Sequence, residues 1–269
     1  MTDLLKRNLA PLTDKAWAAI DAQAARILKG SLSARKVVDV SGPHGWAAAA
    51  VNLGALEAPG KEAVPGVAWA LRKALPLVEI RAPFAVDMAA MDEVDRGRAN
   101  PDFTAVDAAA RRAALFEETA VYHGLAGAGI EGILAAAAHR PVAAALDAPA
   151  FLAAVEKAVV LIEKHGIGGP YALVLGTAPY QRLMSGNPAG YPLPAQVKEM
   201  VHGDVYWSPA IDGGLVLSRR GGDYELTLGQ DLSLGYAGHE GGRVQLFVTA
   251  SFTFRVLEPA AAVGLNFKG

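Results

Sequence analysis

One stretch of the chain, from about Asn52 to Trp69, lacks the apolar periodicity that would let it build a core of its own. It is rich in glycine and proline, and its charged residues are isolated from one another. A segment of this length without regular structure is uncommon inside a compact domain and needs another surface to hold it. The sequence therefore predicts an extended arm or a long two-stranded loop that depends on contacts outside itself.

Composition indicates a folded chain with little charged surface. Hydrophobic residues make up 52% of the 269 residues and charged residues 19%, which excludes a disordered chain and hints at self-association. The formal net charge of -2 offers no field for binding nucleic acid, and the absence of cysteine excludes disulfides and thiol chemistry. With no signal peptide or membrane span apparent, we expect a soluble cytoplasmic protein without nucleic-acid or membrane partners.

Periodicity predicts helices and strands that are mixed without regular βαβ alternation, which is the α+β class. The expected helices are Thr13–Lys29, ended by Gly30, then Thr104–His123, Asp147–Gly166, Pro179–Met184 and Ala195–Val201. The expected strands are Val37–Val40, Val78–Met88, Tyr171–Leu175, Val205–Trp207, Leu215–Arg219, Tyr224–Leu228 and Val244–Val256. The last strand is the clearest, because its alternate residues are apolar along its whole length.

Candidate chemical motifs have simpler structural interpretations. The glycines of Gly127–Gly132 match a dinucleotide-binding pattern, but they follow a helix instead of a strand, which favours an interhelical joint. Glu199 and His202 form one Glu-x-x-His, a half-motif that di-iron bundles need twice. No serine lies in a nucleophile elbow. We expect Glu117 and Glu118 on the outer, solvated or subunit-contacting face of their helix, so the sequence predicts no catalytic or metal site.

Several stretches resemble the encapsulin (linocin/bacteriocin-like) family and occur in family order along the chain. They are LLKRNLAPLTDKAW near the start, Ala34–Val40, Gly42–Trp46, Leu71–Arg81, Gly168–Tyr171, Gly221–Asp223, Gly229–Tyr236 and Ser251–Val256. The resemblance implies a family 1 shell protein, not an enzyme, with the tailed-phage major capsid protein fold of the Hong Kong 97 type. Sixty copies, or a multiple of sixty, would close into an icosahedral nanocompartment.

The family fold implies a division of the chain into four parts. These are an N-terminal interior helix arm (1–38), an E-loop that pairs with a neighbouring subunit (48–80), a peripheral domain (39–47, 81–131 and 226–269) and an axial domain (132–225).

The resemblance also implies a partner, a cargo enzyme such as a dye-decolourising peroxidase or a ferritin-like protein. Its C-terminal targeting peptide would dock in a groove between the N-terminal helix and the peripheral domain. The residues that match the family at this groove are Ile27, Leu28, Leu32, Arg35, Val38, Asp39, Asp231, Leu232 and Leu234. Arg35 and Asp39 are expected at its rim. Ile27, Leu28 and Leu32 fit a groove wall and a core face equally well.

A turn-rich loop is implied to line the pore at the five-fold axis. It consists of Ser185, Gly186, Asn187, Pro188, Ala189, Gly190 and Tyr191. Because the loop carries no charge, we expect weak charge selectivity, and Asn187→Asp should alter the flux of ions or substrate. Where some relatives place a tryptophan that stacks a flavin, this chain has Ala89 and Ala90, so no cofactor is expected.

Two other functions remain open at this point. A phage-derived capsid protein that packages DNA would favour a basic inner face, and a peptidase or bacteriocin would require a nucleophile and a base in one cleft. The sequence displays neither feature.

Overall fold

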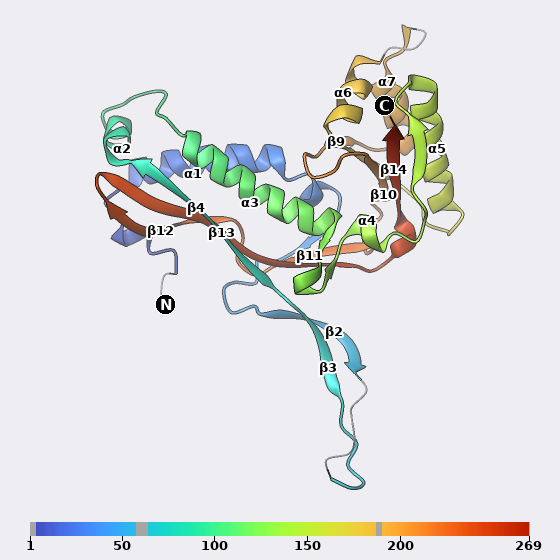
Figure 1. Ribbon diagram of the computed structural model, residues 1–269, viewed down its shortest axis with the longest axis horizontal. Helices are drawn as coiled ribbons and strands as arrows, with labels where there is room; N and C mark the ends of the chain where they lie inside the picture. The colour runs from blue at the N-terminus through green and yellow to red at the C-terminus, as the bar shows by residue number, and fades with distance from the viewer. Residues whose placement is uncertain (1–3, 58–63, 187–189, 269) are drawn as a thin grey trace.

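A computed structural model describes residues 4–57, 64–186 and 190–268 of the protein. Two five-stranded sheets form its described body, together with two two-stranded sheets. Figure 1 shows a long limb that contains the first sheet and two long helices, a second lobe around the other large sheet, and a hairpin that projects away from both. The arrangement confirms the predicted α+β class.

The first sheet is organised around β13 (Arg243–Val256), the predicted long strand. β12 (Ser233–Glu240) pairs with its first half and β11 (Tyr224–Leu228) with its last, while β1 (Asp39–Ser41) extends β11 in parallel. β4 (Val78–Asp87) pairs with β13 over ten residues. The alternate apolar residues of β13 from Val244 to Phe254 are buried, as their spacing predicts, while Val256 is partly buried. From Leu246 to Phe254 the residues between them are buried too.

Two long helices cover this sheet (Figure 1). They are α1 (Asp14–Ser31) and α3 (Thr104–Tyr122). Thr13 caps the start of α1, because its hydroxyl accepts a 3.1 Å hydrogen bond from the Ala16 amide. Gly30 does not end α1 as predicted, because the Leu32 amide still donates to the Leu28 carbonyl at 3.0 Å. A shorter helix, α2 (Met88–Asp95), follows β4 at the end of the limb.

The second sheet has the order β7 (Val142–Ala145), β14 (Ala262–Lys268), β10 (Gly214–Ser218), β8 (Tyr171–Leu175) and β9 (Val205–Trp207). α5 (Ala148–Glu163) packs against β14 and β7, and α6 (Thr177–Ser185) and α7 (Leu193–Val201) lie at the outer end of this lobe. Within the expected peripheral range 226–269, β14 pairs in the second sheet. β11, which begins at Tyr224 in the expected axial range, pairs in the first sheet.

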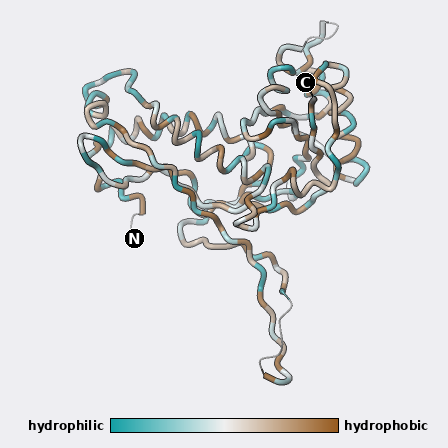
Figure 2. Tube along the Cα trace, viewed as in Figure 1, coloured by the Kyte–Doolittle hydropathy of each residue, from teal (hydrophilic) through white to brown (hydrophobic). Residues whose placement is uncertain are grey.

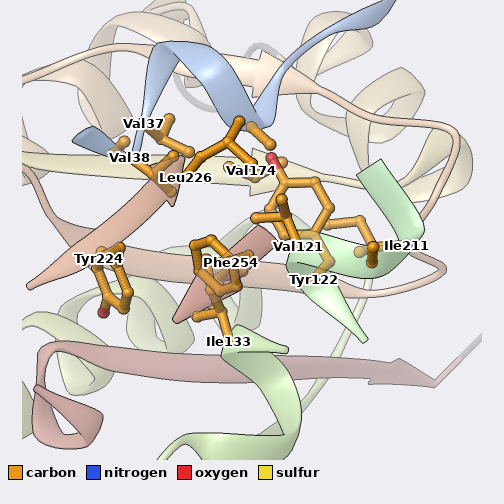
Figure 3. Packing of buried hydrophobic residues seen from close by; sticks show 14 of the residues in the cluster. Val37, Val38, Val121, Tyr122, Ile133, Val174, Ile211, Tyr224, Leu226 and Phe254 are labelled. Atoms are coloured by element: carbon orange, nitrogen blue, oxygen red, sulfur yellow. The ribbon is translucent and has the colours of Figure 1, made fainter. Parts of the chain in front are cut away.

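Short elements connect the two lobes. α3 leads through β5 (Gly124–Leu125), one 3-10 turn and β6 (Ile130–Glu131) into α4 (Ile133–Ala136), so the glycine-rich stretch is the expected joint between helices. Figure 3 shows the core that these connections enclose. Tyr122 from α3, Phe254 from β13 and Val174 from β8 pack into one continuous apolar cluster, which makes the lobes a single body.

The segment without a core of its own forms an antiparallel hairpin. β2 (Ala50–Glu57) pairs with β3 (Leu71–Pro76), with an irregularity between Asn52 and Leu56. Most of its side chains face solvent, including Leu56 and Leu71 at 65% and 59% exposure. Figure 2 shows apolar residues running along the hairpin, far from the body. The two-stranded form of the prediction is therefore the one observed.

Candidate functional site

A groove lies between α1 and β12, and we call it the α1–β12 groove. It encloses about 290 Å³ and is lined by Leu5, Arg7, Asp21, Ala24, Ala25, Leu28, Leu232, Ser233, Leu234 and Val248. Three of the nine residues predicted from the family resemblance meet here, namely Leu28, Leu232 and Leu234. Leu234, on β12, is 5% exposed and lies at the floor of the groove, while Leu28, on α1, is half-buried.

The charged groups at this groove are Arg7 and Asp21. The Arg7 guanidinium donates two hydrogen bonds to the Asp21 carboxylate, at 3.1 and 2.7 Å, and lies 4.1 Å from the centre of the Trp17 ring. The segment before α1 is also attached to the sheet, because the Tyr236 amide donates to the Leu5 carbonyl at 2.8 Å. Sequence reasoning missed this pair, since the spacing of Arg7 and Asp21 matches no regular element.

Arg35 is held inside the protein by two carboxylates. Its Nε and one terminal nitrogen donate to Glu117 at 2.6 and 2.7 Å, and its other terminal nitrogen donates to Asp231 at 2.7 Å. Burial lowers the pKa of Arg35, but the hydrogen bonds and charges of Glu117 and Asp231 outweigh it and raise the pKa above its ordinary value. Arg35 therefore ties the turn after α1 to α3 and to the segment that precedes β12.

Asp231 transmits this contact to the groove wall, because its Oδ1 also accepts a 2.7 Å hydrogen bond from the amide of Leu232. Arg35 thus acts on the groove indirectly, by fixing the residue beside Leu232. Its own side chain is 18% exposed and does not line the cavity.

The other predicted residues lie elsewhere. Ile27 lines a separate hollow on the other flank of α1, and Leu32 is buried beneath the end of that helix. Val38 and Asp39 border a small polar hollow of about 70 Å³ between β1 and the turn before β11. The Asp39 carboxylate accepts a 2.6 Å hydrogen bond from the Gly222 amide there. The structure therefore does not bring Asp39 and Arg35 together at one rim.

The prediction that Glu117 and Glu118 occupy an outer face of α3 is wrong, because both are completely buried. The Glu118 carboxylate accepts hydrogen bonds from the hydroxyl groups of Ser33 and Ser208, the latter at 2.8 Å, and from the Ala34 amide at 2.7 Å. Burial raises the pKa of Glu118, and these donors lower it in part. Ser208 serves this carboxylate and is not a catalytic nucleophile in a cleft.

The predicted pore loop lies between α6 and α7, at the outer end of the second lobe (Figure 1). Asn187, Pro188 and Ala189 fall outside the described residues. On the described flanks, the Leu193 amide donates to the Gly186 carbonyl at 2.9 Å, and the Tyr191 hydroxyl donates to Glu199 at 2.6 Å. This hydrogen bond raises the pKa of Tyr191.

The described part of the chain lacks two features, one typical of metal-binding proteins and one of proteins with membrane-spanning helices. Over residues 4–57, 64–186 and 190–268, no three metal-binding side chains gather into one site. Within the same ranges, no helix has the length and apolarity needed to cross a membrane.

The comparisons with known proteins agree with this architecture. The family described as "Encapsulating protein for peroxidase" matches residues 1–253. The chain is a member of the encapsulin family. The type 1 encapsulin shell protein of Rhodospirillum rubrum is 42% identical over 99% of this chain and 97% of its own length. That of Mycobacterium tuberculosis is 37% identical over 97% of this chain and 98% of its own. The encapsulin chain is thus a shell protein and not an enzyme.

Solved structures establish the fold of this encapsulin. The crystal structure of a virus-like particle from Pyrococcus furiosus superposes with a TM-score of 0.63 at 18% identity, over 93% of this chain and 97% of that one. The capsid of Myoviridae Phage XM1 superposes with a TM-score of 0.57 at 10% identity, over 88% and 92%. The encapsulin has the tailed-phage major capsid fold of the Hong Kong 97 type, as the resemblance implied.

Proposed function

We propose that sixty copies of this shell protein, or a multiple of sixty, close into an icosahedral compartment held together by the β2–β3 hairpin. The observation that carries this proposal is the hairpin itself, which projects from the body with Leu56 and Leu71 exposed. Exposed apolar side chains on an isolated two-stranded ribbon contribute little stability in water. When a second subunit covers them, they become buried in a contact that holds the two subunits together.

Replacing Leu56 with Glu tests this role, because it puts a charge into the proposed contact. Sixty chains of 27.9 kDa amount to about 1.7 MDa, so gel filtration separates shells from free subunits clearly. We expect Leu56→Glu to elute as small species, and Leu9→Glu, at an exposed site before α1, to keep assembling. If Leu56→Glu shells form at the wild-type yield, the hairpin does not hold the shell together.

We further propose that the α1–β12 groove receives the C-terminal targeting peptide of a cargo enzyme. The groove offers an apolar floor from Leu232, Leu234 and Val248, and the Arg7–Asp21 pair beside it suits a peptide with apolar anchors and mixed charges. The family description supports a peroxidase as the cargo, and a ferritin-like protein remains the alternative. The compartment would then lie in the cytoplasm beside its cargo.

Two matched alanines on α1 test the groove. Both Ala25 and Ala18 are exposed on the same helix, but only Ala25 lines the cavity. Each is changed to Asp, and the shell is produced together with a dye-decolourising peroxidase that ends in a C-terminal targeting peptide. An unpaired carboxylate in an apolar groove costs about 1–3 kcal/mol, so Ala25→Asp should lower the peroxidase per shell about tenfold. Ala18→Asp should load normally.

A peroxidase that lacks its C-terminal segment should stay outside every shell. Equal loading of the full and shortened enzymes would refute docking by a terminal peptide. Nucleic acid that copurifies with the particles and resists nuclease would instead favour the alternative of a DNA-packaging capsid.

The loop from Ser185 to Tyr191 is proposed to line a pore at the five-fold axis. Its position at the tip of the second lobe, between α6 and α7, supports this proposal. Ser185→Asp adds a charge at its described flank, and peroxidase turnover of charged substrates inside the shell measures the effect. Unchanged turnover for anionic and cationic substrates alike would contradict a pore-lining role.

A further inference from the structure

A second hollow lies on the other flank of α1, between that helix, α3 and the end of β9. We call it the Trp207 hollow. It is lined by Arg26, Ile27, Gly30, Ser31, Arg111, Leu115, Trp207 and Pro209. Its volume of about 460 Å³ falls within the range of ligand pockets, roughly 300–1,000 Å³. It is separate from the α1–β12 groove and shares no residue with it.

Apolar side chains from three elements form the walls of the Trp207 hollow. Ile27 on α1 is nearly buried, whereas Leu115 on α3 and Trp207 are 42% and 39% exposed. The Trp207 Nε1 already donates to the Thr177 hydroxyl at 3.2 Å, so the polar edge of the indole is occupied. The ring and Leu115 therefore present apolar surface that has no cover within the described chain.

The charge on the Trp207 hollow has one sign. None of the described residues that line it is acidic, and its two charged residues are Arg26 and Arg111. Arg111 lies 3.8 Å from Asp107, but the other oxygen of that carboxylate accepts a hydrogen bond from Gln23. Arg26 makes a 3.4 Å hydrogen bond to Gln23 and no ion pair within the described residues. Two guanidinium groups thus stand beside an apolar cavity without a buried carboxylate to neutralise them.

We propose that the Trp207 hollow binds an apolar organic anion, an aromatic or aliphatic body that carries one carboxylate or sulfonate. The body would fill the space between Leu115 and Trp207, and the anionic group would pair with Arg26 and Arg111. Guanidinium groups suit such oxyanions because their donors match two oxygens at once. An anionic ligand would give Arg26, which has no ion pair among the described residues, a partner and would give Arg111 a second one beside Asp107, so the Trp207 hollow favours anionic over uncharged ligands of the same shape.

Two dyes with the same aromatic body test the proposal on the purified, assembled protein. Anilinonaphthalene sulfonate carries the anion, and phenylnaphthylamine lacks it; both fluoresce more strongly in apolar surroundings. We expect the sulfonate to bind saturably. Arg26→Gln combined with Arg111→Gln should weaken it about fivefold, as the loss of two half-exposed ion pairs would, and change phenylnaphthylamine by less than about twofold.

Matched variants locate the bound dye. Lys29→Gln with Lys157→Gln removes the same net charge from exposed sites outside the hollow and should leave sulfonate binding unchanged. Trp207→Phe should remove most of the energy transfer from tryptophan to the sulfonate dye, and Trp46→Phe should not.

Three results would overturn the proposal. The first is the absence of saturable binding. The second is an equal response of both dyes to the double arginine variant, including no response from either. The third is binding to unassembled chains alone, which would mean that a neighbouring copy covers the Trp207 hollow in the shell.

Discussion

Arg35→Ala would leave the carboxylate of Glu117 buried without its counter-charge. The Glu117 side chain is 0% exposed and receives both of its hydrogen bonds from Arg35 in a bidentate pair. Asp231, the second partner of Arg35, is 44% exposed and regains water when the guanidinium is removed. The loss therefore falls almost entirely on Glu117.

The cost follows from this difference in burial. Removing one partner of a buried ion pair typically costs 3–5 kcal/mol, and the 18% exposure of Arg35 favours the lower end, about 3 kcal/mol. For a chain of this size, each kcal/mol lowers the unfolding midpoint by about 2–4 °C, so we expect a loss of about 6–12 °C. Melting is followed at equal chain concentrations, because subunit association also adds stability.

Two further variants separate the stranded charge from lost packing. Arg35→Met with Glu117→Leu replaces both charges by apolar side chains and should recover most of the midpoint, since an apolar replacement of a buried pair is often neutral. Asp231→Asn should lower stability by no more than about 1 kcal/mol, as expected of a half-exposed pair. The reasoning is refuted if the double variant has the same unfolding midpoint as Arg35→Ala, or if Arg35→Ala has the same midpoint as the wild type.

Four further predictions concern the fold and the shell. Because burial raises the pKa of Glu118, the folded protein binds its proton more tightly than the unfolded chain does. As the pH falls from neutral toward the ordinary glutamate pKa, the melting midpoint of the wild type should rise relative to that of Glu118→Gln. A difference between the two midpoints that stays constant with pH would contradict this. Gly213→Ala would drive its methyl group into the carbonyl oxygen of Leu265 and should cost more than about 2 kcal/mol in urea unfolding. Gly30→Ala meets open space inside α1 and should stabilise by up to about 1 kcal/mol, so a loss would argue against helix at that position. Adding either dye to the wild type should leave the yield of shells unchanged by gel filtration, since the Trp207 hollow and the hairpin share no residue.

Local pattern was sufficient for the long elements. The alternate apolar residues of β13 and the apolar stripe of α1 each follow from one periodicity, which correctly places these side chains in the core. It does not show that Thr249, Ser251 and Thr253 on the other face of β13 are buried as well. The β2–β3 hairpin was predicted from the opposite signal, because a stretch without a core can persist only as an extended or paired arm. These features depend on residues that are neighbours in the chain.

The buried carboxylates could not be predicted in the same way. Two adjacent glutamates on a helix are normally solvated, and nothing near Glu117 and Glu118 in the sequence provides a partner. Their partners, Arg35, Ser33 and Ser208, come from positions more than eighty residues away. Only the parallel packing of α1 and α3 brings these groups together, so the correction required the fold.

Contacts at the two ends of α1 determine how firmly this helix is held as one wall of the α1–β12 groove. Before the helix, Arg7 pairs with Asp21, and at its start the Thr13 hydroxyl donates to Asp95 of α2 at 2.7 Å. After its end, Ser33 and Arg35 bind the two buried glutamates. The contacts at the start of α1 are exposed or only partly buried, but its end cannot swing open without breaking the contacts to the buried carboxylates of Glu117 and Glu118, each of which costs about 1–3 kcal/mol to leave unmade. The groove is therefore preformed, which suits a short peptide that must lose its own freedom on binding.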